Sequence, residues 1–184
     1  MITMMKATST NVIFHTPPEV TNKKSGSIYL TRDLNRDTHW VYCYVTGPES
    51  TLQPGDKLLV SKRVTSYKFE VDGVKMENTS DSAVLCYKRN GKLDATCGTV
   101  IFEWIEPIEE TTASGIVLVR SEANKEVEVT RRAYVHAAGP KSGVKAGDTI
   151  LLAYNKDCYK MENIIDGKVL HNCGTESIIC YFSS

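Results

Sequence analysis

The chain has 184 residues and carries 22 basic and 22 acidic side chains, so its formal net charge is zero. No Lys/Arg cluster has the length or the aromatic interleaving of a nucleic-acid-binding surface. The opening residues Met1–Lys6 lead into polar residues, and no apolar run approaches the roughly 18 residues of a membrane span. We therefore expect a soluble, cytoplasmic protein with no nucleic-acid or membrane partner.

The elements predicted in chain order are short β-strands separated by turn residues, without a convincing amphipathic helix. Trp40–Val45 alternates aromatic and small apolar residues and stops at Gly47-Pro48, which is typical of a strand ended by a turn. Lys57–Val60 follows a Gly-Asp turn, and Asp72-Gly73 predicts a hairpin. Ala83–Tyr87 is the last strand predicted in the first half of the chain.

The segment Lys88–Cys97 is predicted to link this first half to a second half that repeats its landmarks. The repeated landmarks lie 88 to 94 residues apart: Val12–Phe14 with Val100–Phe102, Ile28–Leu30 with Ile116–Leu118, Gly47-Pro48 with Gly139-Pro140, Gly55-Asp56 with Gly147-Asp148, and Asp72-Gly73 with Asp166-Gly167. This spacing favours two small domains, residues 8–90 and 98–184. Many short strands in each domain predict an all-β class, as a small barrel or sandwich.

The cysteines do not form a pattern that predicts a metal site. Six are present, none in a C-x-x-C pair, and Cys173 lies only two residues after His171. Reduced thiols are therefore the expected state. Cys43, Cys86 and Cys180 lie in strand-like stretches, and we expect them to pack in the core as small hydrophobic residues.

No group of residues predicts catalysis either. His136 is isolated in the sequence and is interpreted as a structural histidine. Asp56 and Asp148 follow turn glycines, where a carboxylate commonly accepts hydrogen bonds from nearby backbone amides. The chain also lacks the G-x-x-x-x-G-K-S/T phosphate loop. We expect no catalytic residue, no metal and no cofactor.

Each half contains an apolar triplet inside a polar stretch. Ile116–Leu118 follows Glu109–Gly115, a run of charged and small residues with too little apolar surface to fold alone. Ile28–Leu30 similarly follows Thr21–Ser27. Either triplet could be an ordinary core strand, but the duplication and the surrounding turn residues favour a binding loop.

Four segments of the second half resemble, in order and spacing, the signatures of the GroES-like co-chaperonins: Val100–Phe102, Ser114–Leu118, Ala137–Pro140 and Gly143–Ile150. The resemblance covers residues 98–182. The first half is more divergent, because it keeps Gly47-Pro48 and Gln53–Leu59 but has Tyr29 in the middle of its triplet. Together the two halves resemble a tandem, double-domain co-chaperonin.

This resemblance implies that each half is a small irregular β-barrel and that the chains assemble into a homo-oligomeric ring. The ring would cap a GroEL-type chaperonin, whose ATP or ADP state would control binding. The residues implied to dock on the chaperonin are Ile116, Val117 and Leu118, with Ile28, Tyr29 and Leu30 as first-half equivalents. The glycines at the hinges of these mobile loops would be Gly26 and Gly115.

The chain departs from the resembled family between its Gly-Pro and Gly-Asp landmarks. Glu49–Pro54 and Lys141–Ala146 are short, whereas many members insert a roof hairpin at this point. We therefore expect a dome with an open or thinly covered top. Some phage-encoded co-chaperonins resemble this chain in lacking the roof, and a phage origin would place the protein in the host cytoplasm.

Two other hypotheses stay open. A GroES-like catalytic domain, as in medium-chain alcohol dehydrogenases, would need zinc-ligand cysteines and a G-x-G-x-x-G motif, and the sequence has neither. A structural or decoration protein could reuse the barrel without binding a chaperonin, as the altered first triplet allows. Because the terminal strands of a small barrel leave open edges, we also predict that Val100–Trp104 or Val12–Phe14 pairs with an adjacent domain.

Overall fold

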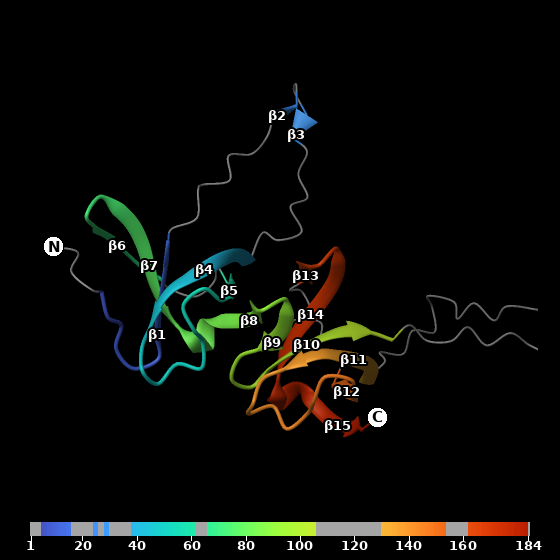
Figure 1. The fold of residues 1–184 in the computed structure, drawn as a ribbon. Coiled ribbons are helices and arrows are strands. Elements are labelled where there is room, and N and C mark those ends of the chain that lie inside the picture. Colours follow the sequence, from blue (N-terminus) through green and yellow to red (C-terminus); the bar gives the residue numbers. More distant parts are fainter. Residues whose placement is uncertain are drawn as a thin grey trace, which may run out of the picture.

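The computed structural model describes residues 5–15, 24–25, 28–29, 38–61, 66–105, 130–153 and 162–183. This part of the chain is all-β, with two short 3-10 helices, η1 (Asp81–Ala83) and η3 (Thr175–Ser177), beside the strands. Two large antiparallel sheets lie next to each other (Figure 1). The predicted all-β class is thus confirmed.

The first large sheet has the strand order β6-β7-β1-β4-β5-β8-β9. Its strands are β1 (Asn11–His15), β4 (Thr38–Thr46), β5 (Lys57–Ser61), β6 (Tyr67–Val71), β7 (Val74–Ser80), β8 (Val84–Arg89) and β9 (Lys92–Ala95). A separate two-stranded sheet consists of β2 (Lys24–Ser25) and β3 (Ile28–Tyr29).

The second large sheet has the strand order β13-β14-β10-β11-β12-β15. Its strands are β10 (Thr99–Trp104), β11 (Thr130–Ala138), β12 (Thr149–Ala153), β13 (Glu162–Ile165), β14 (Lys168–Gly174) and β15 (Ile178–Phe182). This order repeats β6-β7-β1-β4-β5-β8 of the first sheet, strand for strand. The duplication seen in the sequence is therefore also a duplication of topology, with β9 as the additional strand of the first sheet.

The two repeats share even their strand irregularities. The pairing of β1 with β4 shifts register between Ile13 and Phe14, and the pairing of β10 with β11 shifts between Ile101 and Phe102. The pairings β5–β8 and β12–β15 each shift at equivalent points as well. Because a β-bulge redirects the following side chains, shared bulges give the repeats matching inner faces. Residues at matching positions of the two repeats are called counterparts below.

The Gly-Pro landmark marks a close approach between two backbone segments. The Gly47 N–H donates to the carbonyl of Asn11 at 2.8 Å, and the counterpart Gly139 N–H donates to the carbonyl of Thr99 at 2.9 Å. A Cβ added at Gly47 would lie 2.0 Å from the carbonyl oxygen of Ser9. One added at Gly139 would lie 2.2 Å from that of Cys97. Only glycine fits either position, which explains why the landmark recurs.

The Gly-Asp landmark forms the turn that leads into β5 or β12. The carboxylate of Asp56 accepts the Gln53 N–H at 2.7 Å, and that of Asp148 accepts the Lys145 N–H at 2.8 Å. Both aspartates are buried. The interpretation of Asp56 and Asp148 as residues that bond nearby backbone amides is confirmed.

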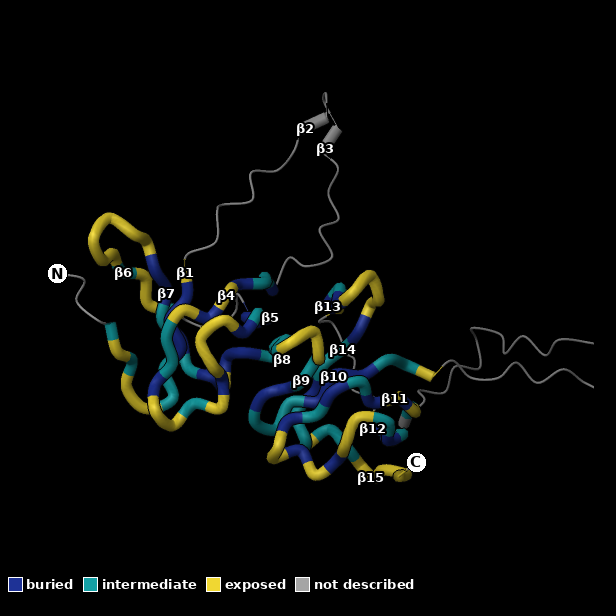
Figure 2. The backbone as a smooth tube through the Cα atoms, viewed as in Figure 1, coloured by how far each residue is buried: buried dark blue, intermediate teal, exposed yellow. Residues whose placement is uncertain are grey.

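Each repeat has its own core, and the two cores correspond position by position. Buried counterparts in the strands are Val12 with Val100, Phe14 with Phe102, Val41 with Ala133, Cys43 with Val135, Leu58 with Ile150, and Val60 with Leu152. Leu52 and Val144, from the turns before β5 and β12, complete the match. Figure 2 shows these buried residues along the inner strands of both sheets.

A third core lies at the junction of the repeats. It consists of Leu59, Cys86, Ala95, Ile101, Ala137, Ile165 and Leu170, all of them buried. Leu59 and Cys86 belong to the first repeat, and most of the others to the second. The two repeats therefore share a continuous apolar interface.

The segment predicted as a linker is part of that junction. β8 continues to Arg89, and a tight turn at Asn90 (φ 53°) and Gly91 (φ 79°) leads into β9, which pairs with β8. Positive φ at both turn residues is typical of a two-residue hairpin turn. Lys88–Cys97 is thus mainly a β-hairpin that joins the sheets.

Two expectations about strand position are wrong. β1 lies between β7 and β4, and β10 lies between β14 and β11, so Val12–Phe14 and Val100–Trp104 belong to inner strands and not to edge strands. Cys43 and Cys86 are buried as expected, but Cys180 is exposed. Cys86 is covered because β9 pairs with β8, whereas among the described strands β15 pairs with β12 alone.

Candidate functional site

The two candidate loops connect counterpart strands. Residues 16–37 join β1 to β4, and residues 106–129 lie between β10 and β11, so both loops connect adjacent antiparallel strands at the same place in the topology. Most residues of the expected loop sites lie outside the described residues: Ile116, Val117, Leu118 and Leu30, which were expected to dock, and Gly26 and Gly115, which were expected to be hinges.

The structure describes the backbone of two residues of the first triplet. Ile28 and Tyr29 form β3, which pairs with β2 in the register Ser25 to Ile28 and Lys24 to Tyr29. This pair belongs to neither large sheet.

An aromatic cluster lies at the base of the second loop. The Trp104 ring, at the end of β10, lies 4.9 Å from the Phe102 ring and 5.8 Å from the His171 ring, between centroids. The Arg131 guanidinium, near the start of β11, lies 4.8 Å from the Trp104 ring centroid, a cation–π distance. The cluster joins the two strands that bracket the loop to β14. Sequence patterns did not predict this cluster, because His171 is far from Trp104 along the chain.

The base of the first loop has different residues. Phe14 and His39 lie 6.3 Å apart between ring centroids, and His15 and Tyr44 lie 5.0 Å apart. His39 is the counterpart of Arg131, so a histidine stands where the second repeat has the cation of its cation–π contact. The two loops therefore start from bases of different chemistry.

His136 takes part in a surface ion cluster. Its Nε2 lies 2.9 Å from Oε2 of Glu103, and the Lys168 Nζ lies 3.9 Å from the same oxygen. The hydrogen bond with His136, together with the charge of Lys168, lowers the pKa of the Glu103 carboxyl below its ordinary value. The cluster ties β10 and β11 to the β13–β14 hairpin, which supports the interpretation of His136 as structural.

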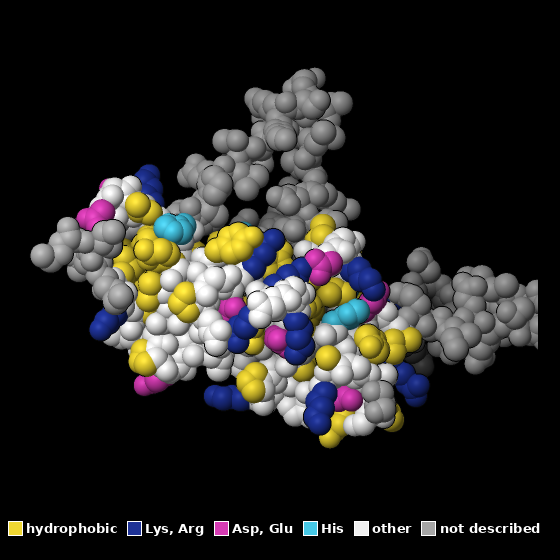
Figure 3. Space-filling view, viewed as in Figure 1, with side chains coloured by type: hydrophobic (Ala, Val, Ile, Leu, Met, Phe, Trp, Pro, Cys, Tyr) yellow, Lys and Arg dark blue, Asp and Glu magenta, His cyan; other side chains and the backbone are white. Residues whose placement is uncertain are grey.

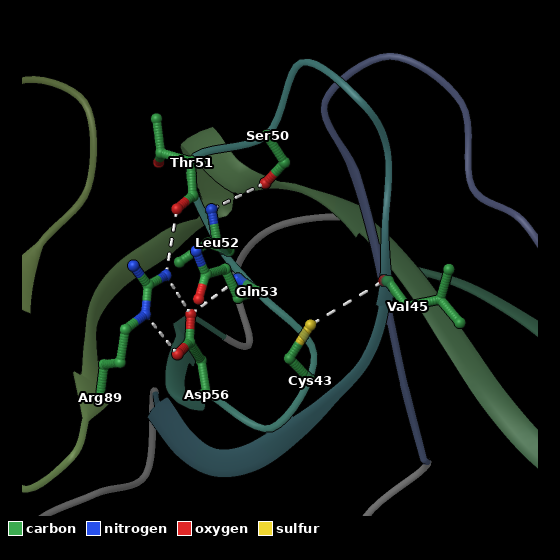
Figure 4. A network of polar contacts seen from close by, with 8 residues as sticks. All are labelled: Cys43, Val45, Ser50, Thr51, Leu52, Gln53, Asp56 and Arg89. Carbon is green, nitrogen blue, oxygen red and sulfur yellow. Dashed lines mark hydrogen bonds and ion pairs between the residues drawn. The ribbon is translucent and has the colours of Figure 1, made fainter.

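The Gly-Asp turn of the first repeat has an additional clamp (Figure 4). The Arg89 Nη2 donates to Oδ2 of Asp56 at 2.7 Å and to the carbonyl of Thr51 at 3.1 Å. The hydrogen bond to Asp56 raises the pKa of the Arg89 guanidinium. The counterpart of Arg89 is Ser183, so the second repeat has a hydroxyl where the first has this cation.

A cleft of about 850 Å³ lies beside the junction of the repeats. It is lined by β9, by the turn from Gly139 to Ala146 and by the β13–β14 hairpin. The Lys92 Nζ lies 3.1 Å from Oδ1 of Asp94, and Lys88 forms an ion pair with Asp166. Figure 3 shows basic and acidic side chains interspersed on this face. The first pair lies within β9, whereas the Lys88–Asp166 pair connects the two repeats.

Within the described residues, no group of three or more His, Cys, Asp or Glu side chains is arranged to hold a metal ion. The same residues include no helix with the length and apolarity to cross a membrane. No protein-family model matches the chain, and no curated protein matches it at a significant level.

Proposed function

We propose that this protein is a tandem co-chaperonin that caps a GroEL-type chaperonin and assists ATP-dependent protein folding. Each repeat, 8–90 and 98–184, would be a GroES-like irregular β-barrel, and several chains would form the capping ring. The observation that carries the proposal is the duplicated placement of the loops. Residues 16–37 and 106–129 join counterpart strands, and each contains one apolar triplet in a polar stretch.

The energetics of a loop with one apolar triplet suit a reversible contact. Burying three aliphatic side chains yields roughly 5 to 9 kcal/mol before other terms. Ordering about ten loop residues costs on the order of 10 kcal/mol. One loop alone would therefore bind weakly. Several loops on one ring would bind together, since later contacts become intramolecular, and each contact would still open readily.

In this proposal the chaperonin supplies the nucleotide chemistry, and its ATP or ADP state controls docking. The co-chaperonin itself contributes shape and the apolar triplets, without a catalytic residue, cofactor or metal. The turns 47–56 and 139–148 contain no strand, so neither repeat has a roof hairpin at this point. An open-topped dome in the cytoplasm, or in the host cytoplasm for a phage protein, fits this geometry.

The test is native mass spectrometry of the protein with a GroEL-type chaperonin and nucleotide. We expect wild type to form a defined complex and the double variant Ile116→Asp/Leu118→Asp to lose it. Ala123→Asp, in the same loop but outside the triplet, is the matched control and should still bind. Equal binding by wild type and the double variant would refute docking through this triplet.

A structural or decoration protein that reuses the same fold is the second candidate. It is favoured by the first loop, where Tyr29 replaces an aliphatic residue and His39 stands in the position of Arg131. Such a protein would assemble normally and ignore the chaperonin whether or not Ile116 and Leu118 are intact. The same experiment therefore separates the two functions.

A further inference from the structure

The outer face of the first large sheet carries a row of aromatic side chains along β4. Successive residues of a strand point to opposite faces of its sheet. Val41 and Cys43 are buried in the core of the first repeat. The alternate residues Trp40, Tyr42 and Tyr44 therefore lie on the outer face. Tyr42 is 63% exposed and Tyr44 is 47% exposed, so solvent reaches two of these rings.

Two lysines lie beside this row. Lys57 of β5 is opposite Tyr42, and Lys88 of β8 is opposite Lys57. Directly opposite residues of an antiparallel pair share one face of the sheet. The Lys57 Nζ lies 5.4 Å from the ring centroid of Trp40 and 6.0 Å from that of Tyr42, and the Lys88 Nζ lies 5.5 Å from that of Trp40. Trp40, Tyr42, Tyr44, Lys57 and Lys88 are called the aromatic–lysine face below.

The aromatic–lysine face is positively charged. The strands that form it, β4, β5 and β8, contain no Asp or Glu at all. A carboxylate reaches the face from the second repeat, where Asp166 forms an ion pair with Lys88. The Asp166 side chain is 70% exposed, so solvent weakens this pair and a phosphate can compete with it. The charge of the face therefore favours an anionic ligand.

The second repeat keeps only part of this face. Tyr134 is the counterpart of Tyr42 and is 43% exposed. The tryptophan and both lysines are replaced, and their counterparts are Arg132, Thr149 and Phe182. A surface that served only the stability of the fold would be equally useful in both repeats. Its restriction to the first repeat indicates a separate role.

Exposed aromatic rings beside cations suit one class of ligand. Nucleic-acid bases stack on such rings with little dependence on sequence, and ammonium groups neutralise the phosphates. An acidic peptide would use the lysines but would leave the tyrosine rings without a planar partner. We propose that the aromatic–lysine face binds single-stranded nucleic acid, with bases on Tyr42 and Tyr44 and phosphates at Lys57 and Lys88. This binding is independent of the proposed co-chaperonin function.

No contiguous sequence pattern predicts the aromatic–lysine face, because three separate strands supply its groups. The sheet order β4-β5-β8 brings these groups together. Figure 3 shows hydrophobic and basic side chains next to each other over β4 and β5. The expectation that nucleic acid is not a partner rested on the lack of a Lys/Arg cluster along the chain, and the assembled face needs no such cluster.

The small number of contacts predicts weak and salt-sensitive binding. Each neutralised phosphate contributes about −0.7 to the slope of log K against log salt for a single strand. Two lysines should therefore give a slope of about −1.4. Binding is best measured at low ionic strength, where the phosphate contacts are strongest.

The test is fluorescence anisotropy of labelled oligothymidylate and oligouridylate, each of about 12 nucleotides, titrated with the protein. Saturable binding of either single strand supports the proposal, and the tighter of the two identifies DNA or RNA as the preferred ligand. A duplex of the same length should bind more weakly, because its bases are already stacked on one another. Absence of saturable binding for both single strands would overturn the proposal.

Matched variants locate the binding surface. Tyr42→Ala should weaken binding roughly 5- to 150-fold through the loss of one stacked base. Lys57→Gln should reduce the salt slope to about −0.7. Tyr134→Ala, at the counterpart position, and Lys75→Gln, at an exposed lysine of β7, should both bind like wild type. Circular dichroism confirms that each variant is folded, and equal affinities of Tyr42→Ala and Tyr134→Ala would contradict stacking on this face.

Polyglutamate separates stacking from charge alone. It carries carboxylates but no aromatic bases, so it should displace the oligonucleotide only when its charge is in large excess. Displacement at equal concentrations of charge would identify a surface for acidic proteins and overturn the proposal. These measurements use the whole chain without a chaperonin, so their failure would leave the capping experiment with Ile116→Asp/Leu118→Asp unaffected.

Discussion

The Arg89 guanidinium forms two parallel hydrogen bonds with the carboxylate of Asp56, from Nε to Oδ1 at 2.9 Å and from Nη2 to Oδ2 at 2.7 Å. The Asp56 side chain is 3% exposed, so this pair satisfies a buried charge at the turn that leads into β5. In the second repeat Ser183 stands where Arg89 does in the first, so this position supplies no arginine to the second turn.

Arg89→Ser should lower the free energy of unfolding by about 1–3 kcal/mol, because it leaves the buried carboxylate of Asp56 without its cation. Urea unfolding followed by circular dichroism measures the change. Lys92→Ser is the control, since Lys92 is 78% exposed and its pair with Asp94 should contribute little. Equal midpoints for wild type and Arg89→Ser would show that the clamp does not stabilise the fold.

Gly47→Ala and Gly139→Ala should each destabilise the protein by on the order of 2–4 kcal/mol, because the added Cβ would overlap a backbone carbonyl oxygen and force one of the two backbone segments to shift. Thermal unfolding of each variant measures the effect. Gln53→Ala, on the exposed side of the same turn, should stay within about 0.5 kcal/mol of wild type. A melting temperature for Gly47→Ala equal to that of wild type would contradict the close approach to Ser9.

The thiols should differ strongly in reactivity. Burial raises the pKa of Cys43 and of Cys86 to about 12, so at pH 8 almost no thiolate forms at either position. Cys180 is exposed. In the folded protein a maleimide should modify Cys180 rapidly and leave Cys43 and Cys86 intact until the protein unfolds. Peptide mapping by mass spectrometry identifies the modified residue, and early labelling of Cys86 would contradict its burial.

The buried thiol of Cys86 should also make stability fall at alkaline pH. Its pKa rises from about 9 in the unfolded chain to about 12 in the folded protein, so above pH 9 the unfolded state loses a proton that the folded state retains. The free energy of unfolding should therefore decrease by about 1.4 kcal/mol per pH unit from this group between pH 9 and 12. Cys86→Ala should show a shallower decline over this window. Parallel pH profiles of the two proteins would refute the shift.

Much of the fold could be predicted because turn glycines and buried strands have strong local signals. Trp40–Val45 lies within β4, and Gly47 and Asp56 form the turns expected of them. The prediction that Val12–Phe14 or Val100–Trp104 forms an open edge was wrong, although the sequence contains a pattern that argues against it. Val12–Phe14 and Val100–Phe102 are continuous apolar runs, as expected of strands enclosed on both sides.

Cys86 and Cys180 show that a local sequence pattern does not determine whether a strand residue is buried. Both lie in strands with the same local pattern, and both were expected in the core. Their burial differs because β9 covers one strand, whereas no described strand covers the other. A covering strand comes from elsewhere in the chain or from another molecule, so the local pattern contains no information about it. The loop triplets pose the same difficulty, since their role depends on a partner.

The internal junction also fixes the parity of any closed assembly. Because β8 and β9 already join two repeats within one chain, any ring built of whole chains gains repeats two at a time. The number of repeats around such a ring is therefore always even. A partner with an odd number of identical docking sites would leave some loop without a site or some site without a loop. Two loops of unequal affinity, as Tyr29 and Val117 imply, would be one way for a tandem chain to accommodate that mismatch.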